Sequence, residues 1–180
     1  MEEDLMATGT EFLKHQVNNA VVSHRAFLEA LKDHKGDARD PRFRDLCTRY
    51  IPPMQEMQNQ LEAYQNELGA DEGMAKKVIG GLMGGARDLA DMANDDFLRL
   101  VRDIILSDQN EDTFRTFREA GRQLGNTRLQ EIGAAGEQGH DNYSRDANRL
   151  VQSMFVESVR GTGPQVTTQP QPGTQPRPAV

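Results

Sequence analysis

The chain of 180 residues contains no tryptophan, one cysteine and only 6% aromatic residues. A single cysteine excludes an internal disulfide framework and a zinc site made of several thiolates, and we expect Cys47 to be a buried apolar residue. No run of 18 apolar residues occurs, so we expect no membrane span. The N-terminal residues are acidic and lack the apolar stretch of a secretory signal, and we therefore expect a cytoplasmic protein.

Basic charge is also scarce. The 21 Lys and Arg residues are outnumbered by 28 Asp and Glu residues, which gives a formal net charge of -7. Proteins that bind the nucleic-acid backbone present a basic surface, and docking on anionic lipid needs the same sign of charge. We therefore expect no nucleic-acid partner and no attachment to an anionic membrane, and a protein partner stays open.

What the chain does contain is a set of apolar residues at helical spacing. In residues 126–160 the inward-type positions recur every three or four residues: Leu129, Ile132, Gly136, His140, Tyr143, Ala147, Leu150 and Met154. The same spacing predicts helices over residues 3–35, 41–69 and 95–124. No alternation with period two occurs, so the sequence predicts an all-α fold. We expect one core that includes Met54, Leu61, Phe117, Leu129 and Tyr143.

Two segments and a pair of prolines depart from this pattern. Pro52 and Pro53 lie within the second predicted helix, where two missing N–H groups and two ring clashes are expected to kink or split it. Residues 69–95 are rich in glycine and predict a long crossover that contains a short helix. Residues 161–180 are rich in proline and glutamine and predict a disordered tail, which leaves residues 1–160 as one helical domain.

The two halves of this predicted domain resemble each other. Residues 20–30 and residues 110–120 share a hydroxyl residue, a phenylalanine and an alanine at the same spacing. When the helices that follow are aligned, Met54 falls on His140. Two similar helical hairpins joined by a long crossover are the layout of one class of four-helix bundle.

On this repeat, and on the phrases FREAGRQLGNTRLQEI, FLEAL and DPRF, the chain resembles the ferritin-like superfamily, closest to its rubrerythrin-like and related small bacterial members. The resemblance covers about residues 5–157. It implies an antiparallel four-helix bundle, assembly into a dimer or larger oligomer, and a bacterial protein of stress response or homeostasis. Members with a di-iron site carry a Glu on the first helix of each hairpin and a Glu-x-x-His on the second.

Most positions that match this motif hold side chains that are poor ligands for iron or manganese: Ala20, Asn110, Met54 and Met57. Only Glu137 and His140 remain, a carboxylate and an imidazole one helical turn apart. Further imidazoles are available from His15, His24 and His34. The alternative role for His140 is a hydrogen bond to a polar neighbour, with Glu137 at the solvent-exposed edge. Three polar neighbours are candidates for that bond: Asn110, Gln16 and Asn19.

We therefore expect a ferritin-like protein that is non-catalytic or binds metal weakly, and that acts through its helical surfaces. No catalytic residue is assigned. The resemblance implies Glu137 and His140 as ligands of a single iron or manganese ion, and a protein without a cofactor is the favoured interpretation. Two alternatives remain: a divergent di-metal oxidase or peroxidase that uses Glu137 and His140, and an adaptor with residues 161–180 as linker or ligand.

Overall fold

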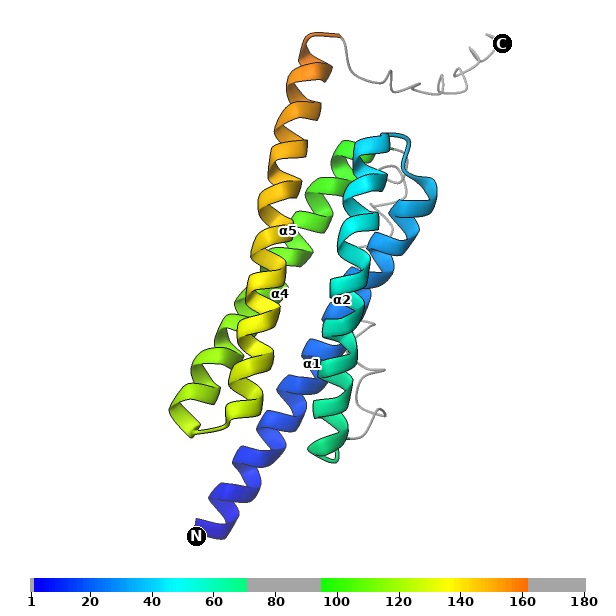
Figure 1. Cartoon of the computed structure of the whole chain (residues 1–180). Coiled ribbons are helices and arrows are strands. Elements are labelled where there is room, and N and C mark those ends of the chain that lie inside the picture. The colour runs from blue at the N-terminus through cyan, green and yellow to red at the C-terminus, as the bar shows by residue number, and fades with distance from the viewer. Residues whose placement is uncertain (1, 71–94, 162–180) are drawn as a thin grey trace, which may run out of the picture.

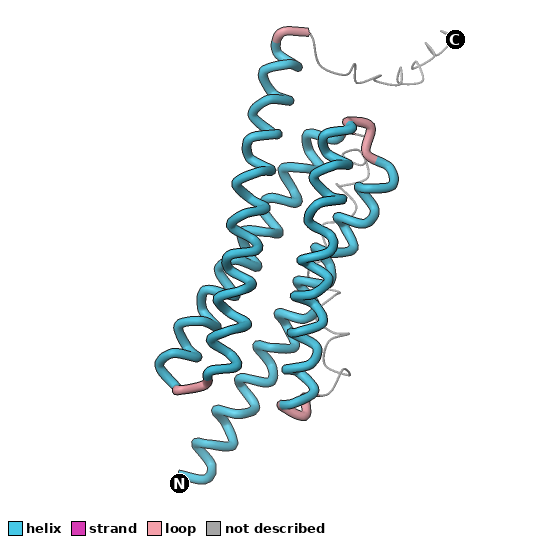
Figure 2. Tube along the Cα trace, in the orientation of Figure 1, coloured by secondary structure: helices cyan, strands magenta, loops and turns pink. Residues whose placement is uncertain are grey.

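The computed structural model describes residues 2–70 and 95–161. In this part of the chain Figure 1 shows four long helices side by side: α1 (Glu2–Asp37), α2 (Pro41–Glu67), α4 (Asp96–Leu124) and α5 (Thr127–Val159). No strand occurs among the described residues, as Figure 2 shows, and the predicted all-α fold is confirmed for them. None of these four helices is long and apolar enough to cross a membrane. The predicted crossover and the predicted tail lie almost entirely outside the described residues.

Three of the helices begin at a residue whose side chain accepts a backbone hydrogen bond: Asp40 for α2, Asp95 for α4 and Asn126 for α5. Such caps satisfy N–H groups that the first helical turn leaves free. Pro41 follows the cap of α2, where its missing N–H is not needed. Gly125 ends α4 with a φ of 67°, a left-handed conformation that glycine adopts without strain.

α2 passes through Pro52 and Pro53 as one helix, so the predicted split does not occur. Both prolines are exposed, whereas Met54, the next residue along the chain, is buried. On the solvent side, carbonyl groups that lose an N–H partner to a proline can bond to water instead. The predicted kink stays a prediction.

The helices pack as a ring of four neighbours. α1 contacts α2 and α4, and α5 contacts the same two helices, so α1 and α5 lie on one diagonal. Figure 1 shows the N-terminal end of α1 and the C-terminal end of α5 projecting at opposite ends of the molecule. This arrangement brings side chains from all four helices to a common interior.

Glycines allow α4 and α5 to approach each other closely. A Cβ atom added at Gly133 would lie 2.2 Å from the backbone nitrogen of Arg118, and one added at Gly121 would lie 2.4 Å from that of Gln130. At Gly136 the added atom would lie 2.3 Å from the ring of Phe114 (the nearest ring carbons). Real Cβ atoms do not come so close to other atoms, so side chains at these positions would force the two helices apart.

The interior contains two apolar clusters rather than the single predicted core. All five residues expected there are buried, but Met54 and Tyr143 belong to one cluster and Leu61, Phe117 and Leu129 to the other. Along α1, α4 and α5 the two clusters are separated by buried polar residues. We call the buried polar side chains at mid-length the polar layer: His24, Gln58, Ser107, Asn110 and His140. All four described helices contribute to it.

Candidate functional site

Glu137 and His140, the two predicted metal ligands, point to different sides of α5. The carboxylate of Glu137 accepts a hydrogen bond from Nε of Arg115 at 3.1 Å and lies 2.6 Å from Nη1 of Arg118, and both arginines are on α4. The side chain of His140 is fully buried, and its Nδ1 lies 3.0 Å from Oγ of Ser107. The structure therefore does not bring the two side chains together, although one helical turn separates them in the sequence.

Ser107 takes the place of the polar neighbour that the sequence suggested for His140. Its hydroxyl lies against Nδ1 of His140 and also donates to the backbone carbonyl of the same residue at 3.3 Å. Asn110, one of the suggested partners, donates instead to the carbonyl of Leu106 at 2.8 Å. The signal that identifies Ser107 in the sequence is a small hydroxyl residue at an inward position of α4, between Ile104 and Asn110.

His24 of α1 is the second imidazole of the polar layer. Its Nδ1 lies 2.8 Å from Oε1 of Gln58 on α2. The amide nitrogen of Gln58 donates to the carbonyl of Val21 at 3.3 Å and to the carboxylate of Glu62 at 2.7 Å. The amide oxygen is therefore the acceptor, and the proton of the neutral His24 ring lies on Nδ1. The His24 and His140 rings meet edge to face, with 5.2 Å between the centroids and an angle of 90° between the planes.

Aromatic rings enclose this pair of histidines. The ring of Phe114 stacks on His140 at 5.5 Å, and the ring of Phe27 lies 5.1 Å from it. Burial lowers the pKa of His24 to about 4. Burial, and then the neighbouring His24, lower the pKa of His140 well below its ordinary value. Both imidazoles are therefore neutral at neutral pH, because a charged ring would lose its hydration without gaining a counter-ion.

The described residues do not fit a di-iron or di-manganese centre. They contain no group of three or more His, Cys, Asp and Glu side chains that could hold a metal ion. The polar layer itself offers two imidazoles, two amides and a hydroxyl, whereas a di-metal centre in a helical bundle needs several carboxylates. Glu137, the carboxylate suggested by the resemblance, is already paired with two arginines outside the layer.

A second buried polar group, which the sequence interpretation missed, connects α1 to α4. Asp103 is fully buried, and its Oδ2 lies 2.8 Å from Nδ1 of His34. Burial raises the pKa of Asp103 against the opposing effect of His34. Burial, and then the nearby Asp103 carboxylate, raise the pKa of Tyr143. The available signal was an aspartate at an inward position of α4, between Leu100 and Ser107.

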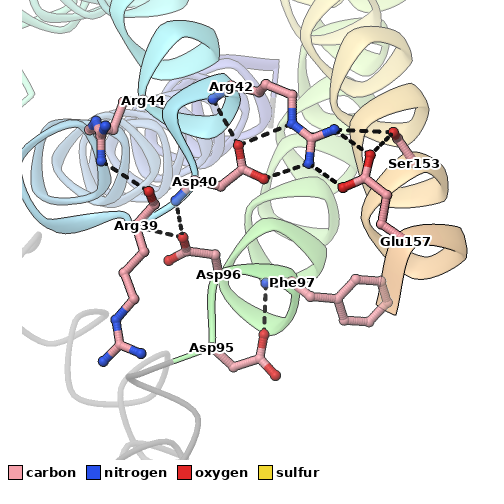
Figure 3. Close-up of polar contacts among 9 residues, drawn as sticks. All are labelled: Arg39, Asp40, Arg42, Arg44, Asp95, Asp96, Phe97, Ser153 and Glu157. Carbon is pink, nitrogen blue, oxygen red and sulfur yellow. Dashed lines mark hydrogen bonds and ion pairs between the residues drawn. The ribbon is translucent and has the colours of Figure 1, made fainter. Parts of the chain in front are cut away.

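A third polar group fixes the ends of the helices, and Figure 3 shows it. We call it the end clasp: Asp40, Arg42, Asp96 and Glu157. Oδ2 of Asp96 accepts hydrogen bonds from the backbone N–H groups of Arg39 at 2.7 Å and of Asp40 at 2.6 Å. Arg42 bridges Asp40 at 2.7 Å and Glu157 at 2.6 Å, and its hydrogen bond is the main cause of the lowered pKa of Asp40. The clasp therefore ties the turn between α1 and α2 to the start of α4 and the end of α5.

Comparison with known proteins assigns this chain to no family. No family model, no curated protein and no solved structure matches it. The resemblance to the ferritin-like superfamily therefore rests on the helical repeat and the quoted phrases, and it stays a prediction. Any functional conclusion depends on the side chains that the structure describes.

Proposed function

We propose that this chain is a non-catalytic, ferritin-like helical protein that acts through its outer helical surfaces and assembles with a second copy of itself. The observation that carries the proposal is an uncharged, largely apolar surface along α4 and α5. We call it the α4–α5 strip, and it consists of Leu98, Val101, Ile105, Asn148, Gln152, Phe155 and Val159. Three of its apolar side chains are well exposed: Ile105 at 53%, Phe155 at 58% and Val159 at 72%.

The members of the α4–α5 strip lie side by side on the two helices. At one end the rings of Phe97 and Phe155 lie 6.2 Å apart, and at the other end Oγ of Ser144 donates to Asp108 at 2.7 Å. These two contacts set the register, so the strip members between them are neighbours across the helix pair. Val159 lies one turn beyond Phe155, on the end of α5 that projects past the start of α4. The spacing of three and four residues within each helix keeps the strip members on one outer face.

A second copy is the partner that this strip suits best. No member of the strip is charged, although 27% of all residues are, so the strip offers nothing that would select a charged partner. Two-fold symmetry places the same surface on both subunits, and an apolar strip meets an equally apolar one of the same size. Seven residues on each side make a small interface, so we expect a dimer that dissociates on dilution.

The orientation of Glu137 and His140 supports a non-catalytic role. The carboxylate of Glu137 is neutralised by Arg115 and Arg118 at the surface, while His140 is sealed between aromatic rings. Joint action of the two on one substrate or ion would require breaking both sets of contacts. That change is unfavourable, because the Glu137 carboxylate would lose its arginine partners and the His140 ring its hydrogen bond.

The positions of the helix ends support the ferritin-like arrangement. Asp96 at the start of α4 bonds to the turn between α1 and α2, whereas Tyr64 near the end of α2 accepts a hydrogen bond from Asn126 in the turn between α4 and α5 at 2.9 Å. The end of α2 and the start of α4 therefore lie at opposite ends of the molecule, as they do in bundles where a long connection joins the second helix to the third. Two helical hairpins joined by one such connection are the ferritin-like layout.

Sedimentation equilibrium over a range of protein concentrations tests the proposed assembly. We expect a dimer for the unchanged protein, and a monomer for Ile105→Glu and Val159→Glu, because each would bury an unpaired carboxylate in an apolar interface. Leu124→Glu is the control, since Leu124 is 74% exposed at the far end of α4 from Val101 and Ile105. A monomer at every concentration, or variants of the strip that assemble as the unchanged protein does, would contradict the proposal.

Elemental analysis separates this proposal from the di-metal oxidase or peroxidase. After growth with added iron or manganese we expect well under one tightly bound ion per chain, for lack of carboxylates in the polar layer. Two ions per chain, lost in Glu137→Ala but kept in the exposed control Glu131→Ala, would favour the enzyme. The adaptor alternative concerns residues 161–180 and stays a prediction.

A further inference from the structure

Two nitrogen atoms in the polar layer lack a hydrogen-bond partner. They are Nε2 of His24 and Nε2 of His140, and neither has a partner among the residues that the structure describes. Both side chains are fully buried. Native proteins rarely leave buried polar atoms unpaired, because the lost hydration is not replaced. Two such atoms on rings whose centroids are only 5.2 Å apart point to a ligand that both rings share.

Each ring is held in place by its other nitrogen. Nδ1 of His24 donates to the amide oxygen of Gln58, whose orientation is set by its own two hydrogen bonds. Oγ of Ser107 donates its proton to the backbone carbonyl of His140. The lone pairs of this Oγ atom are therefore free to accept a hydrogen bond from Nδ1 of His140. With Nδ1 protonated, each Nε2 carries a free lone pair. Metal-binding histidines are held in the same way, with one nitrogen on the metal and the other hydrogen-bonded to the protein.

The distance between the two rings suits one shared metal ion. A metal lies about 2 Å from an imidazole nitrogen, so the centroids of two rings bound to one ion are roughly 5–6 Å apart. The centroids of His24 and His140 are 5.2 Å apart. The rings come from helices on one diagonal of the bundle, and an ion between them would therefore link the two helical hairpins.

The chemistry of the pair selects a soft ion of low charge. Two neutral imidazoles cannot compensate the charge of a buried divalent iron or manganese ion. Buried soft donors lie near this level of the bundle: Met54 and Met57 are buried on α2, and the methyl carbon of Met54 would lie 3.8 Å from a Cβ on Gly139, the residue before His140. Thioether and imidazole donors together favour copper(I). We propose that Nε2 of His24 and Nε2 of His140 bind one copper(I) ion.

Competition for copper(I) tests this site in the full-length protein. Copper(I) is added without oxygen in the presence of a coloured copper(I) chelator, and the copper withdrawn from the chelator is measured. We expect one copper(I) per chain, and at least about a tenfold weaker affinity for His24→Gln and for His140→Gln, since even the loss of a ligand's hydrogen-bond partner has an effect of that size. His15→Gln is the control, because His15 is exposed and lies outside the polar layer.

A second measurement needs no variant and so does not depend on whether the variants fold. Copper(I) is diamagnetic, and one equivalent should shift the Nε2 resonances of His24 and His140 in the unchanged protein while those of His15 and His34 stay in place. Failure of the unchanged protein to withdraw copper(I), or binding without a shift at His24 and His140, overturns the proposal. Neither result depends on whether the α4–α5 strip forms a dimer.

Discussion

Replacement of Gly133 by alanine tests the close packing of α4 against α5. The added Cβ would lie 2.2 Å from the backbone nitrogen of Arg118, 2.6 Å from its Cα atom and 2.7 Å from the carbonyl oxygen of Phe114. All three atoms belong to the backbone of α4. No side-chain rotation can relieve these contacts, so the two helices would have to separate.

The expected loss of stability follows from two opposing effects. Overpacking of a well-packed interior destabilises a protein by about 1–3 kcal/mol and occasionally by more. Alanine is favoured over glycine inside a helix by about 1 kcal/mol, which offsets part of the loss. Because the clash is with rigid backbone, we expect a net loss of roughly 2 kcal/mol. In a protein of this size that lowers the melting temperature by about 4–8 °C.

Gly139→Ala is the matched control on the same helix. A Cβ atom at Gly139 would meet only the methyl carbon of Met54 at 3.8 Å, an ordinary contact. The same substitution should therefore leave stability unchanged or raise it by up to about 1 kcal/mol. Urea unfolding followed by circular dichroism measures both variants. If Gly133→Ala proves as stable as Gly139→Ala with the same helix content, α4 and α5 do not touch at Gly133.

Two further predictions concern titratable groups. His24 has a pKa of about 4 when buried and the ordinary 6.5 when unfolded, so the unfolded state of the metal-free protein binds more protons between these values. The free energy of unfolding should therefore fall as pH drops from 6.5 towards 4, by about 3 kcal/mol for this group. In urea unfolding, His24→Gln should show a weaker dependence on pH than the unchanged protein. An equally steep dependence in the variant would contradict this prediction. Burial raises the pKa of Cys47 to about 12, so its thiol should react with a disulfide reagent at pH 8 only as the protein unfolds, and rapid reaction of the native protein would show that it is accessible.

The helices and most of their buried face could be predicted from local patterns. Apolar spacing identifies the helices, and Asp40, Asp95 and Asn126 mark three of their starts because a cap bonds within its own turn. Of the kink or split predicted at Pro52 and Pro53, the split does not occur and the kink stays a prediction; both prolines lie on the exposed side of α2. Which side of a helix is exposed to solvent depends on how the other helices pack against it.

The direction of individual side chains could not be predicted in the same way. Glu137 and His140 stand one turn apart, and their spacing suits a shared ligand as well as it suits two unrelated environments. Arg115 and Arg118 draw Glu137 outward, and Ser107 holds His140 inward. These partners lie on another helix, and no spacing within α5 reports their positions.

The sequence by itself therefore determines four long helices, the caps of three of them and most of the faces that become buried, because each depends on residues a few positions apart. Only the tertiary structure decides that the ring of His24 meets that of His140, that polar side chains divide the interior into two apolar clusters, and that Glu137 lies outside them. The reason is physical. The free energy of a buried imidazole or carboxylate depends on the donors, acceptors and charges that other helices place around it, and helix packing sets which of these are near.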